Sequence, residues 1–407
     1  MIRLNAAALA FALLAVVAGC KNEGAPSQGS GMVGAAATGP IIIGEVGSMT
    51  GNEATFGTSS DKGIQLAVSE ANAAGGVKNR KIEVRVLDDE GKPEQAATAT
   101  TKLIASDHAT AILGEVASSR SKFMAPKAQA AKVPMITPSS TNPEVTAIGD
   151  YIFRACFIDP FQGYVMAKFT RENLKLGKIA ILRDVRNAYS IGLADVFKEN
   201  FTKMGGTILA DESFSAGDVD FRAQLTKIKQ FSPEGIFVPG YYTDVGLIAR
   251  QAKDSGITVP LLGGDGWDSE KLWEIGGEAL LGSYFSNHYS VDDPSPRIQE
   301  FVAKFKKAYG GMVPDSLAAQ AYDAAGMLVD AMKRATDLSG PAIRDALANT
   351  KAYRGVTGDI TLDAKRNPVK PAVVLKLAKG GKYEYVTTIQ PEGTPAPQAA
   401  GTPSANK

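Results

Sequence analysis

The sequence is poor in the side chains on which metal sites and disulfide frameworks depend. It contains only two cysteines and two histidines among its 407 residues. Two cysteines can build neither a disulfide framework nor a Cys-based zinc module. The two histidines, His108 and His288, lie outside any H-E-x-x-H pattern. We therefore expect a protein with no metal site and no cofactor.

An excess of charge of one sign is also missing. Lys and Arg number 44 and Asp and Glu 43, which gives a net charge of +1. Nucleic-acid binding requires clustered positive charge, so we expect no nucleic-acid partner. Catalytic motifs are equally scarce: there is no P-loop, no G-x-S-x-G elbow and no G-x-G-x-x-G after a strand. Cys156 lies in an apolar stretch with no candidate histidine to activate it, so we predict that it is buried and that the chain is not an enzyme.

The amino terminus has the pattern of a lipoprotein signal. Arg3 precedes an apolar run over residues 6–17, which is too short to span a bilayer but suits a signal peptide. The run ends in Val17-Ala18-Gly19-Cys20, which resembles the bacterial lipobox. We predict a signal peptide over residues 1–19 and a flexible tether over 20–39 that starts at a lipidated, membrane-anchored Cys20. An ordinary secretory signal with an incidental cysteine is the alternative.

Between the termini, strand and helix patterns alternate. A buried strand run at 41–46 is followed by a helical stripe at 58–74 and an alternating strand at 81–88, and the same βαβ pattern begins again at 179–182. This repetition predicts an α/β fold of two Rossmann-like lobes, each a parallel sheet flanked by helices, with a ligand cleft between them. The expected lobes are 40–158 plus 287–355 and 159–286 plus 356–390, and a disordered tail is expected over 391–407.

Two hydroxyl-rich loops follow neighbouring strands of the first lobe. They cover residues 114–121 and 137–143, and both place hydroxyls and free backbone N–H groups before a predicted helix. Such positions suit a small anion such as a carboxylate. One Ser-Ser pair alone indicates only a helix cap, but two such loops on consecutive βα units favour a binding role.

The second lobe offers complementary groups. A Gly- and Asp-rich loop at 263–268 follows a predicted strand, and Asp265 in it is suited to pair with an ammonium group. Tyr189 and the sequence Pro239-Gly240-Tyr241-Tyr242 occupy similar strand-end positions, with packing at the edge of the core as the alternative role for these tyrosines. One lobe thus offers hydrogen-bond donors for a carboxylate, and the other offers an acid for an ammonium group. Together they suit a zwitterion. The acidic run 88–90 is interpreted as a solvated strand end, with cation binding as the less favoured alternative.

Seven short motifs occur in order along the body, between residue 43 and residue 266. They are Ile43-Gly44-x3-Met49-Thr50-Gly51, Glu70-Ala71-Asn72-x2-Gly75-Gly76-Val77, Val86-Leu87-Asp88-Asp89, Ile136-Thr137-Pro138-x2-Thr141-x-Pro143-Glu144-Val145-Thr146, Gly240-Tyr241, Arg250-Gln251-Ala252 and Gly264-Asp265-Gly266. Each is weak alone. The ordered set is similar to the type I periplasmic solute-binding proteins of branched-chain amino acid ABC transporters, the leucine/isoleucine/valine-binding family.

The resemblance implies a set of ligand-binding residues. The family's donors to the ligand α-carboxylate fall on Ser118, Ser139 and Thr141. Its acidic partner of the ammonium falls on Asp265, where leucine-type members carry Glu. Matches to ring, hydroxyl and side-chain contacts fall on Tyr189, Tyr241, Phe56 and Leu317. The disulfide that some members carry is missing, because Gly91 and Ala117 stand at those positions.

The resemblance also implies a function. It predicts a monomeric, extracytoplasmic protein, in the periplasm or cell envelope, that captures an amino acid, with Leu, Ile or Val favoured, by hinge closure. Its partners would be the permease and ATPase subunits of an ABC importer, and the anchor would hold it on a membrane. A ligand sensor, or a binder of a related amide, urea or aromatic acid, is the alternative.

Overall fold

The computed structural model describes residues 39–391 of the chain. The predicted signal peptide, Cys20, nearly all of the tether and nearly all of the tail lie outside these residues. Within the described part, no helix combines the length and the apolar composition that crossing a bilayer requires.

The first of two large sheets has five strands, all parallel, in the order β2-β1-β3-β4-β5. Its strands alternate with helices along the chain, as the sequence predicts. The elements are β1 (Ile41–Gly47), α1 (Ala54–Ala73), β2 (Ile82–Asp88), α2 (Pro93–Ala105), β3 (Ala111–Leu113), α3 (Ser118–Ala131), β4 (Met135–Thr137), α4 (Glu144–Ala147) and β5 (Ile152–Arg154).

Strand β1 shows why this sheet is covered on both faces. Its residues Ile41 and Ile43 pack in the core formed with α1, α11 (Ser316–Arg334) and α12 (Gly340–Ala348). The residue Val46 packs instead in the core formed with α2 and α3. A central parallel strand therefore carries a continuous apolar run, because both of its faces are buried. We call this sheet with its helices lobe 1.

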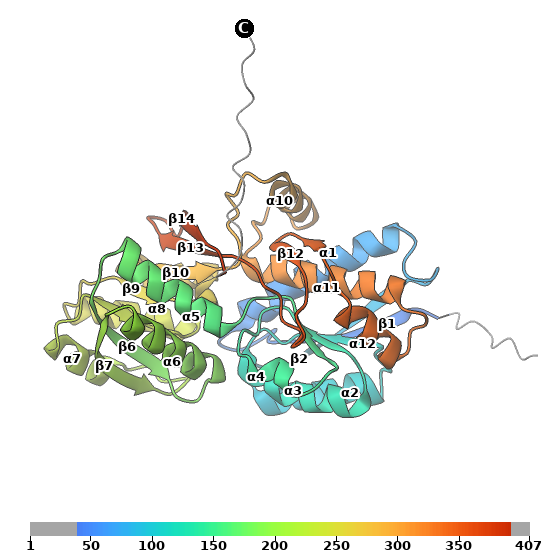
Figure 1. Ribbon diagram of the computed structural model, residues 1–407, viewed down its shortest axis with the longest axis horizontal. Coiled ribbons are helices and arrows are strands. Elements are labelled where there is room, and N and C mark those ends of the chain that lie inside the picture. Colours follow the sequence, from blue (N-terminus) through green and yellow to red (C-terminus); the bar gives the residue numbers. More distant parts are fainter. Residues whose placement is uncertain (1–38, 392–407) are drawn as a thin grey trace, which may run out of the picture. The chain divides into compact units, whose positions relative to one another are not determined.

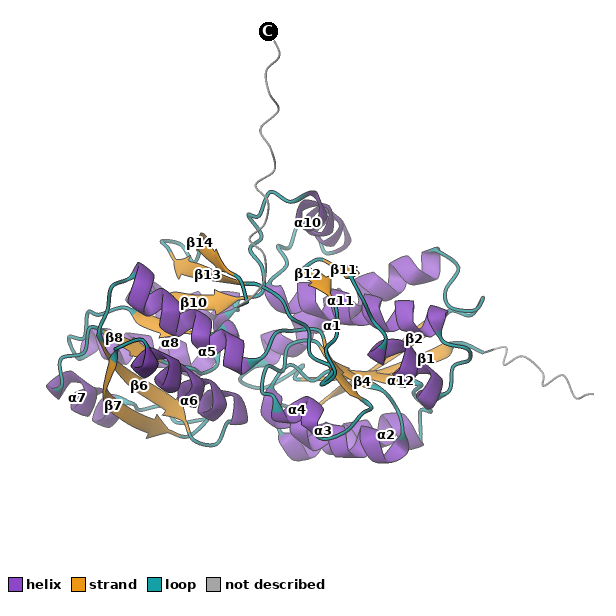
Figure 2. Ribbon diagram, in the orientation of Figure 1, coloured by secondary structure: helices purple, strands orange, loops and turns teal. Residues whose placement is uncertain are grey.

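The second sheet has seven strands in the order β14-β13-β10-β9-β8-β6-β7 (Figures 1 and 2). Five strands are parallel, and β13 and β14, drawn in red in Figure 1, add an antiparallel hairpin at one edge. The elements are α5 (Asp159–Lys168), extended by a wider turn over Phe169–Asn173, β6 (Lys178–Asp184), α6 (Ala188–Lys203), β7 (Thr207–Phe214), α7 (Arg222–Gln230), β8 (Gly235–Phe237), α8 (Tyr242–Asp254), β9 (Leu261–Gly263), α9 (Glu270–Gly276), β10 (Tyr284–Asn287), β13 (Ala372–Leu377) and β14 (Tyr383–Ile389). We call this sheet with its helices lobe 2.

The remaining elements return to lobe 1. Helix α10 (Pro296–Ala308) packs on α1 and α11, and the hairpin of β11 (Tyr353–Gly355) and β12 (Gly358–Ile360) places Ile360 in the lobe 1 core. The last crossing to lobe 2 therefore follows residue 360. The two-lobed α/β architecture is confirmed, while the lobe boundaries given above stay a prediction.

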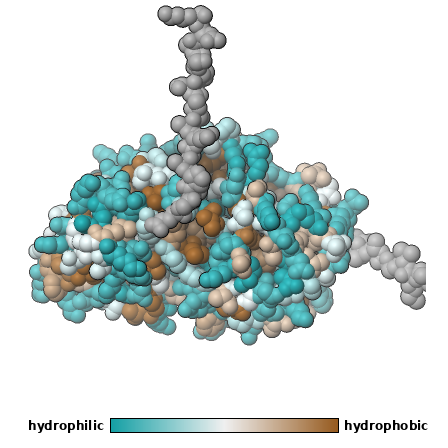
Figure 3. Space-filling model, in the orientation of Figure 1, coloured by the Kyte–Doolittle hydropathy of each residue, from teal (hydrophilic) through white to brown (hydrophobic). Residues whose placement is uncertain are grey.

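Three segments cross between the lobes, after β5, after β10 and after β12. They meet side by side: the Lys370 Nζ atom donates to the Ala155 carbonyl at 3.1 Å, and the His288 ring stacks on Phe157 with ring centroids 3.8 Å apart. The crossing segments thus form one packed unit, which positions loops of both lobes. On the face drawn in Figure 3, hydrophilic residues predominate and apolar residues form separate patches.

Candidate functional site

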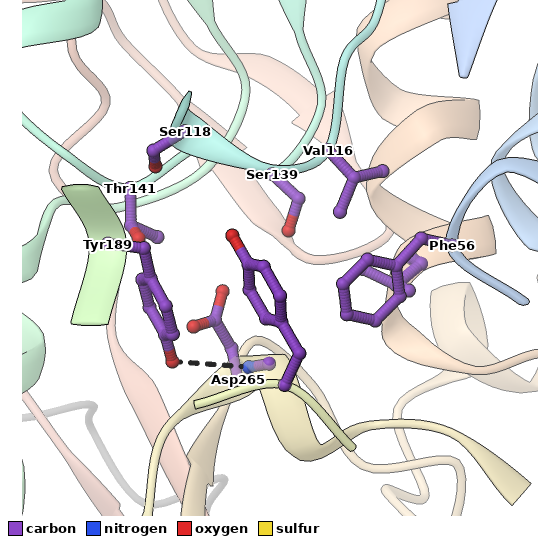
Figure 4. A pocket seen from close by; sticks show the side chains of 10 residues that line it. Phe56, Val116, Ser118, Ser139, Thr141, Tyr189 and Asp265 are labelled. Atoms are coloured by element: carbon purple, nitrogen blue, oxygen red, sulfur yellow. Dashed lines mark hydrogen bonds between the residues drawn. The ribbon is translucent and has the colours of Figure 1, made fainter. Parts of the chain in front are cut away.

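A pocket lies between loops that follow strands of the two lobes (Figure 4). All eight residues that the sequence predicted as ligand contacts line it together. Its lining consists of Phe56, Val116, Ser118, Ser139, Thr141 and Leu317 from lobe 1 and Tyr189, Tyr241, Asp265 and Gly266 from lobe 2. The space between its lining atoms is about 240 Å³, including the part that is open to solvent. The side chains therefore surround a narrow space suited to a small ligand.

The lobe 1 side of the pocket presents hydroxyl groups and a helix end. Helix α3 starts at Ser118 with no side-chain cap, which leaves its first backbone N–H groups available to an anion. The Ser118 hydroxyl accepts a hydrogen bond from the Asn142 N–H at 3.2 Å, which ties the two hydroxyl-rich loops together. The Ser139 hydroxyl has one long contact within the described part of the chain, 3.4 Å to the Gln320 side-chain oxygen. These groups can receive a carboxylate.

The Thr141 hydroxyl is buried and forms no hydrogen bond of normal geometry within residues 39–391. Its polar neighbour is the Asp159 carboxyl, and burial raises the pKa of that carboxyl to about 8. A buried hydroxyl without a firm partner costs free energy, so Thr141 is prepared to donate to a ligand.

The lobe 2 side presents one buried carboxyl. Asp265 is 5% exposed, and its two oxygens are held by two side chains: Gln162 Nε2 lies 2.8 Å from Oδ1 and His288 Nε2 lies 3.0 Å from Oδ2. No Lys or Arg of the described residues lies within 4.0 Å of it. A buried carboxylate without a cationic partner attracts an ammonium group strongly.

Glycines allow the loop that carries Asp265 to approach its neighbours. A Cβ atom at Gly264 would lie 2.4 Å from the Tyr189 hydroxyl, and one at Gly266 would lie 2.8 Å from the Gly240 carbonyl. The Gly266 N–H instead donates to the Tyr189 hydroxyl at 3.2 Å (Figure 4). The glycines therefore allow this loop to pack directly against Tyr189 and Gly240.

Aromatic rings form a wall of the pocket. Tyr189 and Tyr241 stack with centroids 5.4 Å apart, and Phe56 meets Tyr241 edge-on at 5.2 Å. Burial raises the pKa of both tyrosines, so they stay neutral. With Leu317 and Val116 they offer an apolar surface beside the polar groups. The arrangement suits a zwitterion with an apolar side chain.

A buried charged cluster supports the loop that leads to Ser118. The Arg120 guanidinium lies 2.8 Å from Glu53, 3.0 Å from Glu115 and 3.8 Å from Asp89. The Ser48 hydroxyl lies 2.8 Å from Asp89 and 3.0 Å from Glu115. Burial raises the pKa of Asp89 to about 7 and also raises the pKa of Glu53. Burial opposes the charged form of Arg120, but the neighbouring carboxyls outweigh it and raise the pKa of the guanidinium.

The interpretation of residues 88–90 as a solvated strand end is therefore wrong at its centre. Asp88 and Glu90 are exposed, but Asp89 is fully buried because Arg120, 31 residues later, reaches its carboxyl. The sequence order alone does not reveal this partner.

Other predicted positions have different outcomes. Cys156 is buried as predicted, and burial raises the pKa of its thiol to about 12. Arg183, near the end of β6, pairs with Asp211 and Asp195 and does not line the pocket. The sequence reasoning missed Val116 and Gly266 in the lining, and Gln162 and His288 behind Asp265. His288 directly follows β10, and this strand-end position was the available signal.

Several contacts join the lobes around the pocket. The Asn142 side chain donates to the Ala188 carbonyl at 2.9 Å, and the Ala188 N–H donates to Ser119 at 2.9 Å. At another side of the pocket, the hydroxyls of Thr55 and Ser269 lie 3.0 Å apart. The lobes are therefore closed over the pocket.

Comparison with known proteins identifies the family. The family model described as "Periplasmic binding protein" matches residues 40–382, most of the chain. The chain belongs to the periplasmic binding protein family. This confirms the resemblance that the seven motifs indicated. The family is one of transport-associated solute binders and not a class of enzymes.

Solved structures of similar proteins agree with this family. A leucine-binding protein, LivK, from Thermotoga maritima is 38% identical, with a TM-score of 0.83, over 86% of this chain and 99% of that one. The branched-chain amino acid binding protein LivJ of Streptococcus pneumoniae, in complex with isoleucine, is 36% identical, with a TM-score of 0.82, over 86% and 100%. A Rhodopseudomonas palustris solute-binding protein in complex with benzoate is 25% identical, with a TM-score of 0.78, over 87% and 98%. The present periplasmic binding protein thus resembles binders of amino acids and of an amine-free acid.

Proposed function

We propose that this periplasmic binding protein is the substrate-binding subunit of an ABC importer and captures a branched-chain amino acid. The observation that carries the proposal is the buried carboxyl of Asp265, which has no Lys or Arg within 4.0 Å among residues 39–391 and faces hydroxyls and the α3 N-terminus across a small pocket with an apolar wall. An amino acid satisfies all three features at once. The similarity to LivK and to the isoleucine complex of LivJ supports this choice.

Two features would account for binding: the charged groups of the ligand find partners in the pocket, and the two lobes close around it. The ligand ammonium would pair with Asp265, and its carboxylate would accept hydrogen bonds from Ser118, Thr141 and the first N–H groups of α3. Closure of the lobes removes water, and charge-assisted hydrogen bonds gain strength when water is excluded. The aliphatic side chain would lie against Phe56 and Leu317. The closed form would then be recognised by the permease and its ATPase.

Calorimetric titration with the twenty amino acids tests this function. We expect heat of binding for leucine, isoleucine and valine, and little for charged amino acids, because the pocket wall near Phe56 and Leu317 is apolar. Ligand released from the purified protein by denaturation should be the same compound when identified by mass spectrometry. No heat with any amino acid would rule out the proposal.

An aromatic acid is the second candidate ligand, because one similar protein was solved with benzoate. The pocket argues for the amino acid, since benzoate has no cationic group to neutralise Asp265. Including benzoate and 4-hydroxybenzoate in the titration distinguishes the two candidates. Binding of either acid with no binding of amino acids would favour the second.

We also propose that the protein is anchored through a lipid on Cys20, on the strength of the Val17-Ala18-Gly19-Cys20 motif. A lipidated cysteine with several acyl chains gives stable membrane attachment. Cells expressing the full chain and fed a fatty-acid analogue should label the protein, and the Cys20→Ala variant should lose both the label and the membrane fraction. The Cys156→Ala variant is the matched control and should keep both. Labelling that survives Cys20→Ala would refute the anchor.

A further inference from the structure

The carboxyl of Asp265 is held by two side chains that carry no positive charge. Gln162 Nε2 donates to Oδ1 at 2.8 Å and His288 Nε2 lies 3.0 Å from Oδ2. Both side chains are buried, Gln162 at 0% and His288 at 3% exposure. The two contacts fix the orientation of the carboxyl and leave its charge for another partner.

His288 acts as a neutral donor in this arrangement. Burial lowers the pKa of its imidazole, although the neighbouring carboxyls of Asp265 and Asp268 oppose that effect and the Lys370 ammonium adds to it. Its Nδ1 atom is buried with no hydrogen-bond partner among residues 39–391, so a second ring proton would have no acceptor. The proton therefore belongs on Nε2, where Asp265 accepts it.

The two donors are attached to the segments that cross between the lobes. His288 directly follows β10 and stacks on Phe157 of the first crossing segment, with an interplanar angle of 22°. Gln162 lies in the first turn of α5, immediately after that same segment. The orientation of Asp265 is therefore set by the place where the crossing segments meet.

We propose that Gln162 and His288 are positioning residues that make an amine obligatory on the ligand, because they orient Asp265 towards the pocket without neutralising it. The inference rests on the proposed function, since it assigns the selectivity of the same pocket. A cationic residue at position 162 or 288 would neutralise the Asp265 carboxylate within the protein. The pocket would then not require an amine on the ligand. With two neutral donors, an amine-free acid leaves a buried charge uncompensated.

The test compares amino acids with the same molecules lacking the amine. The full chain and its variants are titrated with leucine, valine and phenylalanine, and with 4-methylpentanoate, 3-methylbutanoate and 3-phenylpropanoate. For His288→Leu and Gln162→Leu we expect amino-acid affinity to fall by about tenfold or more, the range for a hydrogen bond to a charged group. Affinity for the amine-free acids should change by less than about threefold or rise.

Conservative and control variants separate positioning from a general structural role. His288→Gln places an amide N–H near the position of Nε2, and it should restore amino-acid affinity to within about threefold of the wild-type value. His108→Asn changes the other histidine, which is exposed and lies outside the pocket lining, and it should have no effect on either series. Thermal unfolding of each variant verifies that it is folded.

The outcomes distinguish this inference from the proposed function. If the wild-type protein binds amino acids but His288→Leu and Gln162→Leu reduce both ligand series equally, or neither series, the positioning role is wrong and the function stands. If the wild-type protein binds the amine-free acids and no amino acid, both proposals fail.

Discussion

Replacing Asp265 with alanine should weaken amino-acid binding by at least about 2 kcal/mol, which is roughly thirtyfold in Kd. The carboxyl is 5% exposed and has no cation among its described neighbours, so a bound ammonium would lose its only close negative charge in the pocket. In the variant the ammonium would be buried without a counter-charge, and this desolvation cost adds to the lost attraction. Asp265→Asn, which keeps the size and removes the charge, should show a similar loss.

A second buried carboxyl provides the control for this experiment. Asp244 is 8% exposed and lies near the start of α8, but it does not line the pocket. Asp244→Asn should leave the amino-acid Kd within about threefold of the wild-type value. Calorimetry on the three variants measures the difference. An Asp265→Asn protein that is folded and binds with unchanged affinity would contradict the assignment of Asp265 to the ligand ammonium.

Replacing Arg120 with methionine should reduce the free energy of unfolding by about 3–5 kcal/mol, the range for breaking a buried charge pair from one side. The guanidinium is the cation shared by Glu53, Asp89 and Glu115, and the side chains of Asp89 and Glu115 have no exposed surface. Without Arg120, buried carboxyls face each other with no cation between them. Arg120→Lys should reduce the free energy of unfolding by less, because lysine keeps the positive charge and lacks only the several N–H groups with which the guanidinium contacts more than one carboxylate.

The loss in free energy of unfolding that Arg120→Met causes should grow as the pH rises. Burial already raises the folded pKa of Asp89 to about 7, so between about pH 4 and pH 7 the folded state holds a proton that the unfolded state has released. A raised pKa makes stability decline as pH rises from the unfolded value, about 4, through the folded value. Loss of Arg120 removes the positive charge that restrains this pKa and that of Glu53, which extends the decline to higher pH.

Urea unfolding of the wild type and of Arg120→Met at pH 5 and pH 8 measures this dependence. The difference between the two proteins should be larger at pH 8. Arg186→Met, which removes an exposed arginine, should unfold like the wild type at both values. A deficit of Arg120→Met that is the same at both pH values would show that lost packing, rather than charge, dominates.

Much of the fold follows from local patterns in the sequence. Runs such as 41–46 are apolar on consecutive residues, which occurs when a parallel strand is buried on both faces, and the glycines at 75–76 and 205–206 follow the ends of helices. Most of the pocket was predictable because all its lining residues except Phe56 and Leu317 follow strands closely, and the carboxyl ends of parallel strands meet at one edge of a sheet. Resemblance to a family then selected eight individual positions, and all eight line the pocket.

The missed residues depend on contacts between distant segments. Gln162 and His288 reach Asp265 from 103 and 23 residues away, and no local pattern marks a glutamine in the first turn of α5 as a partner of a loop after β9. The burial of Asp89 was not predicted because a run of three acids is usually solvated. In the structure the Arg120 guanidinium lies near the Asp89 carboxyl and offsets its charge. The antiparallel β13–β14 hairpin depends on pairing with β10, which local periodicity does not specify.

The closed walls of the pocket have a kinetic consequence. Because the contacts Asn142–Ala188 and Thr55–Ser269 join the two lobes beside the pocket, we expect a ligand held between the lobes to leave only when these contacts part. Release must wait for these contacts to part, so the residence time of a ligand is bounded by the opening rate of the lobes. The strength of individual pocket contacts then affects how often the lobes open while a ligand is bound. Substitutions at the junction of the lobes, outside the pocket, should therefore also change the rate at which the ligand dissociates.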